Sequence, residues 1–188
     1  MIGRAVAKVK IVATNEVVAT VKAYGKGLQL CVDEAWSRRI RNNVKLHPFV
    51  YKRLRQSLPA QLAVACIKQA CGIVKRAKSK PVIKRAFVSY NFPRSASLKG
   101  NVLALRLLKG RQEFSVKIPD CYVEYFKSWK LTDSLLRIDR QGKAYFLFGF
   151  SKEADALNNA SQKHVLGVDL ARARQVERHH TLVRVPDI

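Results

Sequence analysis

The sequence predicts an α+β protein in which a strand comes first, helices follow, and several strands come after them. Two periodicities indicate this order. Apolar residues alternate with polar ones over residues 5–13 and again in the second half, whereas between residues 15 and 78 they recur at helical spacing. Composition is the third observation: 48% of the 188 residues are hydrophobic, so the chain can form a core and wholesale disorder is not expected.

The charge of the chain indicates a polyanionic partner. Lys and Arg number 36 against 13 Asp and Glu, a formal net charge of +23. Nucleic acid is the commonest polyanion, although ribosomal and membrane-surface proteins share this charge. No apolar run approaches the ~18 residues of a membrane span, and the alternating start is unlike a secretory signal. We therefore expect a nucleic-acid-binding protein of the cytoplasm, with no membrane or small-molecule partner.

Residues 5–13 predict a half-buried strand with a basic outer face. The face expected to be buried consists of Ala5, Ala7, Val9, Ile11 and Ala13. The opposite face carries Arg4, Lys8 and Lys10, and we take Lys8 and Lys10 as candidate nucleic-acid contacts.

A long helix is expected next, from an N-cap at Thr14 or Asn15 through apolar positions that recur from Val17 to Ala35. Gly25 and Gly27 weaken its middle, which predicts a kink or a break there.

Two further helices are expected after a basic connector at residues 38–43. The first covers residues 47–58, and Pro59 fits the first turn of the second, which runs to about residue 78. Its expected buried face consists of Ala63, Ile67, Ala70 and Val74. Gln61, Lys68 and Lys75 share one strip because they are spaced by heptads. Such a strip is either a solvated face or a nucleic-acid contact. The candidate contacts of this region are Arg53, Gln61, Lys68, Lys75, Arg76 and Lys78.

Residues 81–150 predict a strand-rich region after a basic hinge at residues 75–84. Strands are expected over residues 82–92, 101–108 and 114–118, then one or two helical turns over residues 122–130. The clearest hairpin covers residues 135–150 around Gln141 and Gly142. The four cysteines, Cys31, Cys66, Cys71 and Cys121, form no C-x-x-C pair. We expect them to be buried core thiols in a reducing cytoplasm and not zinc ligands.

An apolar run at residues 165–170 follows a polar spacer at residues 151–163 and contains one carboxylate, Asp169. A buried strand with an Asp in its interior is destabilised unless the carboxylate has a partner, typically a metal ion. Asp169 is therefore either a metal ligand or a turn residue at the end of a core strand.

In this order the pieces resemble the transposon-encoded RNA-guided nucleases of the TnpB (OrfB) family, relatives of the type V CRISPR effectors. The resemblance covers about residues 1–170, and its specific part is the order and spacing of the pieces. It is carried by Lys8-Val9-Lys10-Ile11, Asn43-Val44-Lys45-Leu46-His47, Leu58-Pro59-Ala60-Gln61-Leu62-Ala63, the hairpin at residues 135–145, and Val165-Leu166-Gly167-Val168-Asp169-Leu170.

The resemblance implies a wedge-like β-barrel formed by residues 1–14 and 81–150, with a helical recognition lobe at residues 15–80 inserted into it. Residues 151–163 would be a linker, and residues 164–171 the single first strand of a RuvC or RNase H-like domain. Family members bind a guide RNA and double-stranded target DNA at the prokaryotic nucleoid, which makes Gln61, Lys68 and Lys75 candidates near the target. Asp169 matches the first catalytic carboxylate of a Mg²⁺-dependent DNA endonuclease and transposase system.

Residues 172–188 depart from the family. Ala171 stands where the family has glycine, only Glu177 and Asp187 are acidic among the residues printed after Asp169, and the family's zinc-binding cysteine pairs are absent. We expect a disordered non-family tail, as a frameshifted or truncated reading frame would give. We also expect an incomplete metal site that binds no Mg²⁺ tightly, and a chain that binds nucleic acid without cleaving it. Two alternatives stay open: half of a split nuclease completed by a second chain, and a stand-alone RNA-binding regulator.

Overall fold

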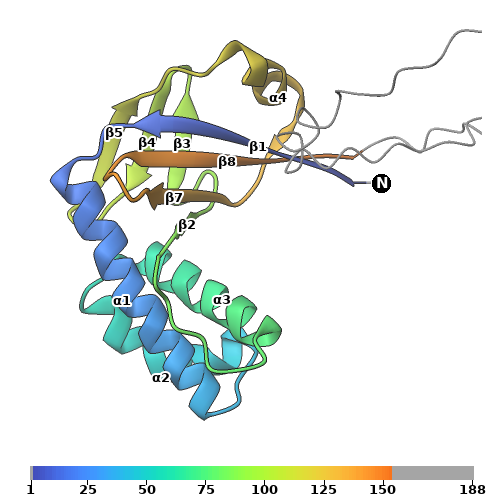
Figure 1. Cartoon of the computed structure of the whole chain (residues 1–188). Coiled ribbons are helices and arrows are strands. Elements are labelled where there is room, and N and C mark those ends of the chain that lie inside the picture. The colour runs from blue at the N-terminus through green and yellow to red at the C-terminus, as the bar shows by residue number, and fades with distance from the viewer. Residues whose placement is uncertain (1, 154–188) are drawn as a thin grey trace, which may run out of the picture. The chain divides into compact units, whose positions relative to one another are not determined.

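The structure, a computed structural model, describes residues 2–153 of the chain (Figure 1). It confirms the predicted α+β class and the predicted order of strand, helices and strands. The elements are β1 (Ile2–Ile11), α1 (Asn15–Ser37), α2 (Asn43–Arg55), α3 (Ala60–Arg76), β2 (Val88–Tyr90), β3 (Ala96–Lys99), β4 (Val102–Arg106), β5 (Arg111–Ser115), a 3₁₀ turn (Asp120–Tyr122), α4 (Val123–Ser128), β6 (Lys130–Leu131), β7 (Ser134–Ile138) and β8 (Ala144–Glu153).

The strands of residues 2–153 form two antiparallel sheets and no closed barrel. The five-stranded sheet has the order β1-β8-β7-β2, and β6 also pairs with β8. β1 pairs with β8 along its whole length, from Ile2 opposite Glu153 to Ile11 opposite Ala144. The second sheet has the order β3-β4-β5 and lies behind the first in Figure 1. Both sheets contribute to one hydrophobic core, but no ladder joins their edges within the described residues, so the barrel implied by the resemblance is not closed.

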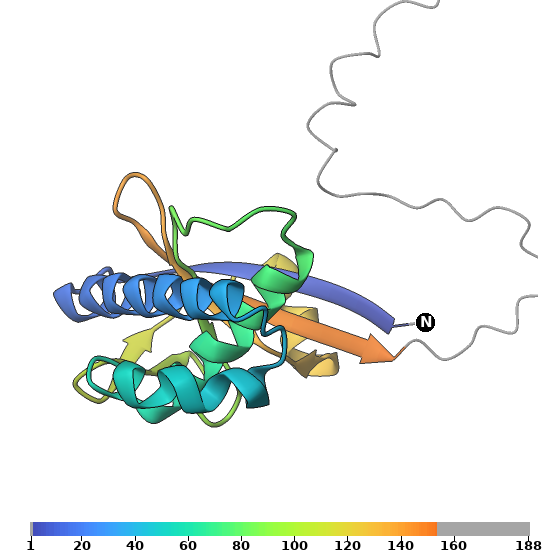
Figure 2. The same cartoon turned by 90° about the horizontal axis from the view of Figure 1, so that it is seen from below.

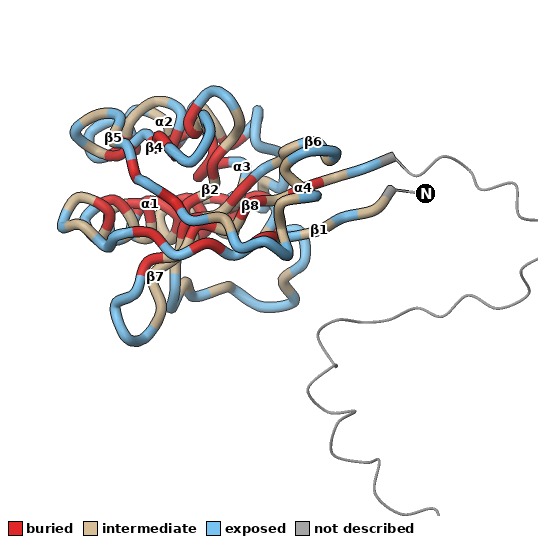
Figure 3. The backbone as a smooth tube through the Cα atoms, turned by 90° about the horizontal axis from the view of Figure 1, so that it is seen from above, coloured by how far each residue is buried: buried red, intermediate tan, exposed pale blue. Residues whose placement is uncertain are grey.

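The core at the sheets is aromatic. Phe146, Phe148 and Phe150 are alternate residues of β8 and are all buried. The ring centroids of Phe146 and Phe148 are 4.7 Å apart, and Phe126 of α4 packs edge-on against Phe148 and Phe150 at 5.0 and 4.9 Å. The Tyr90 hydroxyl donates to the carbonyl oxygen of Arg106 at 3.0 Å, which ties β2 of one sheet to β4 of the other. Figure 3 shows the buried positions along α1 and β8.

β1 confirms the predicted alternation. Ala7, Val9 and Ile11 are buried, whereas Lys8 and Lys10 are exposed. The strand was expected over residues 5–13, but it covers Ile2–Ile11 and pairs with β8 over that whole range. Ala5 is half-buried, and Ala13 lies beyond the strand and is exposed.

α1 is one continuous helix from Asn15 to Ser37, so the glycines do not break it. Thr14 is the N-cap, and its Oγ1 accepts from the Val17 N–H at 3.3 Å. Gly27 faces α2, where a Cβ atom would lie 2.9 Å from Leu54 Cδ2, and Gly25 faces Ala86 at 3.0 Å. These glycines permit close packing on α1, and the packing outweighs their low helix propensity.

The other two helices of the bundle differ from prediction only at their ends. α2 starts at Asn43, earlier than expected, because Asn42 Oδ1 accepts from the N–H groups of Val44 and Lys45 at 2.8 and 3.3 Å. α3 has the predicted buried face and packs on α1 and α2. Cys31, Cys66 and Cys71 are buried in this bundle as predicted, but Cys121 is exposed because it lies in the 3₁₀ turn.

A strand was predicted over residues 82–92, but only Val88–Tyr90 forms one. This is the largest difference between the predicted and the observed strands. The Gln29 side chain of α1 satisfies the backbone there instead: its Nε2 donates to the Pro81 carbonyl at 3.3 Å, and its Oε1 accepts from the Ile83 N–H at 2.7 Å. The short strand β3 was not predicted.

β8 extends to Glu153, so residues 151–153 belong to a strand and not to the predicted linker. Residues 154–188, which include the rest of that linker, the predicted RuvC-like strand and the tail, lie outside the described residues. Among residues 2–153, no helix combines the length and the apolar character that crossing a bilayer requires.

Candidate nucleic-acid interface

One side of the five-stranded sheet is basic, and its residues are exposed along β1 and half-buried along β8 and β7. On β1 the exposed residues are Arg4, Val6, Lys8 and Lys10. Directly paired residues of neighbouring strands point to the same face. Lys10 pairs with Tyr145 of β8, and Tyr145 pairs with Arg137 of β7, so these three side chains form one row across the sheet. We call Arg4, Lys8, Lys10, Arg137 and Tyr145 the sheet-face cluster.

Tyr145 is at the centre of this cluster. Nζ of Lys8 lies 4.1 Å from the centroid of its ring, and Cζ of Arg137 lies 5.9 Å from it. Both distances are within the range of cation–π attraction. An aromatic ring flanked by cations is also how proteins hold single-stranded nucleic acid, because bases stack on the ring and phosphates pair with the cations.

Among residues 3–152, whose side chains the structure describes, no acidic residue forms an ion pair with a cation of the sheet-face cluster. The ion pairs found there join Arg38 and Arg53 to Glu34, Lys68 to Asp133, and Lys80 to Asp33. The positive charge on the sheet face is therefore available to an external anion.

A groove of about 850 Å³ lies beside the cluster, between β1 and the chain that follows β5. Four lysines line it, and no carboxylate does. They are Lys8, Lys10, Lys117 and Lys143. The groove continues the basic surface from the sheet face to the hairpin turn that joins β7 to β8.

The predicted strip on α3 is exposed as expected: Gln61, Lys68 and Lys75 all reach solvent, as do Arg76 and, beyond the helix end, Lys78.

Lys68 has a partner within the protein. Its Nζ lies 2.9 Å from Oδ2 of Asp133, which follows β6, and the two side chains are 65% and 48% exposed. Asn91 Nδ2 also donates to this carboxylate. An exposed pair of this kind contributes about 0–1 kcal/mol, so a phosphate can compete for Lys68.

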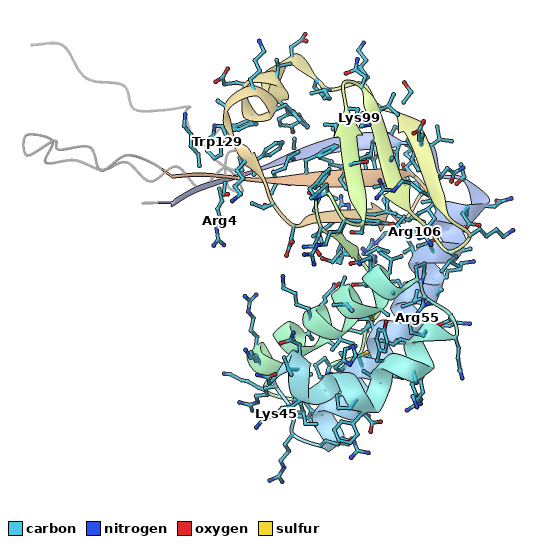
Figure 4. All side chains as sticks on the ribbon, turned by 180° about the vertical axis from the view of Figure 1, so that it is seen from behind. Arg4, Lys45, Arg55, Lys99, Arg106 and Trp129 are labelled. Atoms are coloured by element: carbon cyan, nitrogen blue, oxygen red, sulfur yellow. The ribbon has the colours of Figure 1, made fainter. Side chains whose placement is uncertain are left out.

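Arg53, the candidate on α2, is exposed and pairs with Glu34 at 3.6 Å. Around it α2 has Lys45, Lys52 and Arg55 and no acidic residue. His47 and Tyr51 stack on this helix with ring centroids 4.3 Å apart. Figure 4 shows Lys45 and Arg55 projecting from the helical bundle, and Arg4 projecting from the far end of the sheet. α2 is thus a second basic and aromatic surface.

The structure brings some of the predicted contacts together and leaves others apart. Lys8 and Lys10 share the sheet face with Tyr145 and Arg137, which sequence reasoning did not select. The α3 strip lies on a separate element. The sequence could have revealed Arg137 and Tyr145, because pairing the strands of the predicted hairpin at residues 135–150 places them opposite each other.

The predicted metal ligand Asp169 lies outside the described residues. Within residues 2–153, no three His, Cys, Asp or Glu side chains are grouped so that they could bind a metal ion.

No protein-family model matches the sequence, and no curated protein matches it significantly.

Proposed function

We propose that the chain binds nucleic acid through the sheet-face cluster. The observation that carries this proposal is the Tyr145 ring with Lys8 and Arg137 beside it, neither of which forms an ion pair with an acidic residue among residues 3–152. Bases stack on the ring, and Lys8 and Lys10 neutralise the phosphates on either side. The net charge of +23 supports this by attracting any polyanion to the surface.

We further propose that this surface belongs to the N-terminal part of an RNA-guided nuclease of the TnpB type. The element order supports the proposal, since a first strand, three helices and a return to strands ending in a long hairpin match the order that the resemblance implies. The two sheets would correspond to the wedge-like barrel and α1–α3 to the recognition lobe. The partners would be a guide RNA and double-stranded DNA, at the nucleoid. No Mg²⁺-dependent step is assigned to residues 2–153, because they contain no suitable group of ligands.

The proposal is tested by fluorescence anisotropy with a labelled single-stranded RNA and a labelled DNA duplex over a range of salt concentrations. The variant combines Lys8→Gln with Lys10→Gln. The matched control combines Lys22→Gln with Lys26→Gln, which removes the same charge from exposed positions of α1.

The loss of two phosphate contacts reduces the slope of log affinity against log salt by about 1.4 for single strands or about 1.8 for a duplex. We expect that reduction in the Lys8 and Lys10 variant and a smaller one in the control. Equal slopes for the two variants would show that the sheet face is not the binding surface.

A further inference from the structure

A pocket of about 370 Å³ lies between the segment that leads into β2 and the turn of the β7–β8 hairpin. Figure 2 shows this segment (green) and the hairpin turn (orange) beside each other. Three arginines line the pocket: Arg85, Arg137 and Arg140. The rest of its wall is formed by Ala86, Phe87, Ile138, Asp139 and Gln141. Arg85 and Arg140 are exposed, and Arg137 is half-buried.

The charges around this pocket are unbalanced. Asp139 is its one lining carboxylate, and its Oδ1 accepts from the N–H groups of Gln141 and Lys143 at 2.9 and 2.8 Å. Asp139 therefore holds the hairpin turn, and none of the ion pairs of the described residues links it to an arginine. The residues that line the pocket thus carry three positive charges against one negative charge, and this excess favours an anion.

Arg137 adds an independent observation. Its Nε is buried and has no hydrogen-bond partner, and no other side-chain nitrogen or oxygen of the described residues is in this state. Buried donors are almost always paired in folded proteins, so an unpaired one requires an explanation. No hydrogen bond of Nε therefore holds the Arg137 side chain in place, and its guanidinium group can turn toward an anion in the pocket.

We propose that this pocket binds one phosphate group of a nucleic-acid strand. The planar forks of arginine match the oxygen geometry of phosphate, and they bind it more tightly than point charges do. A pocket of this volume also has room for the attached sugar or base, which Phe87 can contact.

The pocket is continuous with the sheet-face cluster, because Arg137 belongs to both. A strand stacked on Tyr145 therefore reaches the pocket at the hairpin end of the sheet. That the phosphate belongs to a bound strand rests on the proposed function. That the pocket binds a phosphate group does not rest on it.

The phosphate itself is tested first, without nucleic acid. Thermal unfolding of the full chain is followed while inorganic phosphate replaces chloride at constant ionic strength. At ten times its dissociation constant, phosphate raises the unfolding midpoint of the wild-type protein by about 3–6 °C. Arg137→Gln and Arg85→Gln abolish the rise, and Lys99→Gln, an exposed cation on β3, retains it. Arg85 lies outside helices and strands, so its replacement keeps the test valid if Arg137→Gln fails to fold.

A second arm identifies the source of the phosphate with RNA oligonucleotides that carry a 5′-phosphate or a 5′-hydroxyl. If the pocket takes a terminal phosphate, the wild-type protein prefers the phosphorylated strand, and Arg85→Gln loses the preference. If it takes a backbone phosphate, both strands bind equally, and Arg85→Gln reduces the salt slope of each by about 0.7.

The inference is overturned if phosphate gives no more stabilisation than chloride and the Arg85 and Arg137 variants bind all probes as Lys99→Gln does. Oligonucleotide binding that persists in that case leaves the proposed function intact. A saturable effect of phosphate without any oligonucleotide binding supports the pocket and refutes the proposed function.

Discussion

Gly149→Ala tests how the structure places the basic sheet face. Gly149 is in β8, opposite Val6 of β1. On the other edge of β8, strands β6 and β7 both pair with it, and residues 132–133 between them come close to Gly149. A Cβ atom there would lie 2.6 Å from the backbone oxygen of Asp133 and 2.7 Å from Thr132 Oγ1. Because the first of these atoms belongs to the backbone, no side-chain rotation relieves the contact. Residues 132–133 have to move.

The expected loss in the free energy of unfolding has two parts, overpacking and weakened hydrogen bonds. Overpacking costs about 1–3 kcal/mol. The displaced segment also weakens two hydrogen bonds, from the Thr132 N–H to the Gly149 carbonyl at 2.8 Å and from the Gly149 N–H to Ser134 Oγ at 3.1 Å. Each such bond contributes about 1 kcal/mol, so weakening both without breaking them costs about 1 kcal/mol in total. We therefore expect a loss of about 2–4 kcal/mol, which lowers the unfolding midpoint by about 4–16 °C for a chain of this size.

Thermal unfolding followed by circular dichroism measures this loss. The matched control is Gly72→Ala, on an exposed part of α3 where an added Cβ atom meets nothing within 4 Å. Alanine there raises stability by about 0.5–1 kcal/mol through helix propensity. If Gly149→Ala unfolds at the wild-type temperature while the control behaves as expected, the close approach of residues 132–133 to Gly149 is wrong.

Two further predictions concern the helical bundle and the buried tyrosines. Gly27→Val destabilises the protein by about 1–3 kcal/mol in urea unfolding, because a Cβ atom there meets Leu54 at 2.9 Å; Gly72→Val costs nothing comparable, and equal effects would contradict the helix packing. Burial raises the pKa of Tyr24 and of Tyr90 above the usual range, so their stabilising effect is complete below about pH 10 and falls above it, where the unfolded tyrosines ionise. The stability difference between the wild-type protein and a Tyr24→Phe or Tyr90→Phe variant should therefore shrink between pH 9 and pH 11, and a difference independent of pH refutes the burial.

The hairpin at residues 135–150 shows what local sequence can predict. Its strands alternate, and a Gly142 with φ of 78° closes the turn, so period and turn chemistry agree. The same pairing placed Arg137 beside Tyr145, and working out the register would have found the centre of the candidate interface from sequence alone.

Other features depend on contacts between distant parts of the chain. The Gln29 side chain of α1 forms hydrogen bonds with the backbone of Pro81 and Ile83. The alternating pattern that begins at residue 82 therefore predicts a strand there that does not form. β3 has the sequence Ala-Ser-Leu-Lys, with little strand propensity, and forms because β4 pairs with it. The glycines of α1 look like weak points locally, and only the approach of Leu54 explains why Gly27 stands inside a continuous helix.

The central claim is that nucleic acid lies on the sheet face at Tyr145. The most direct measurement is photocrosslinking of a bound RNA that contains 4-thiouridine, followed by tryptic digestion and mass spectrometry. We predict that the main crosslinked peptide is residues 144–152, which contains Tyr145 and lies between Lys143 and Lys152 as cleavage sites. Crosslinks confined to α1–α3 or to residues beyond 153 would contradict the account.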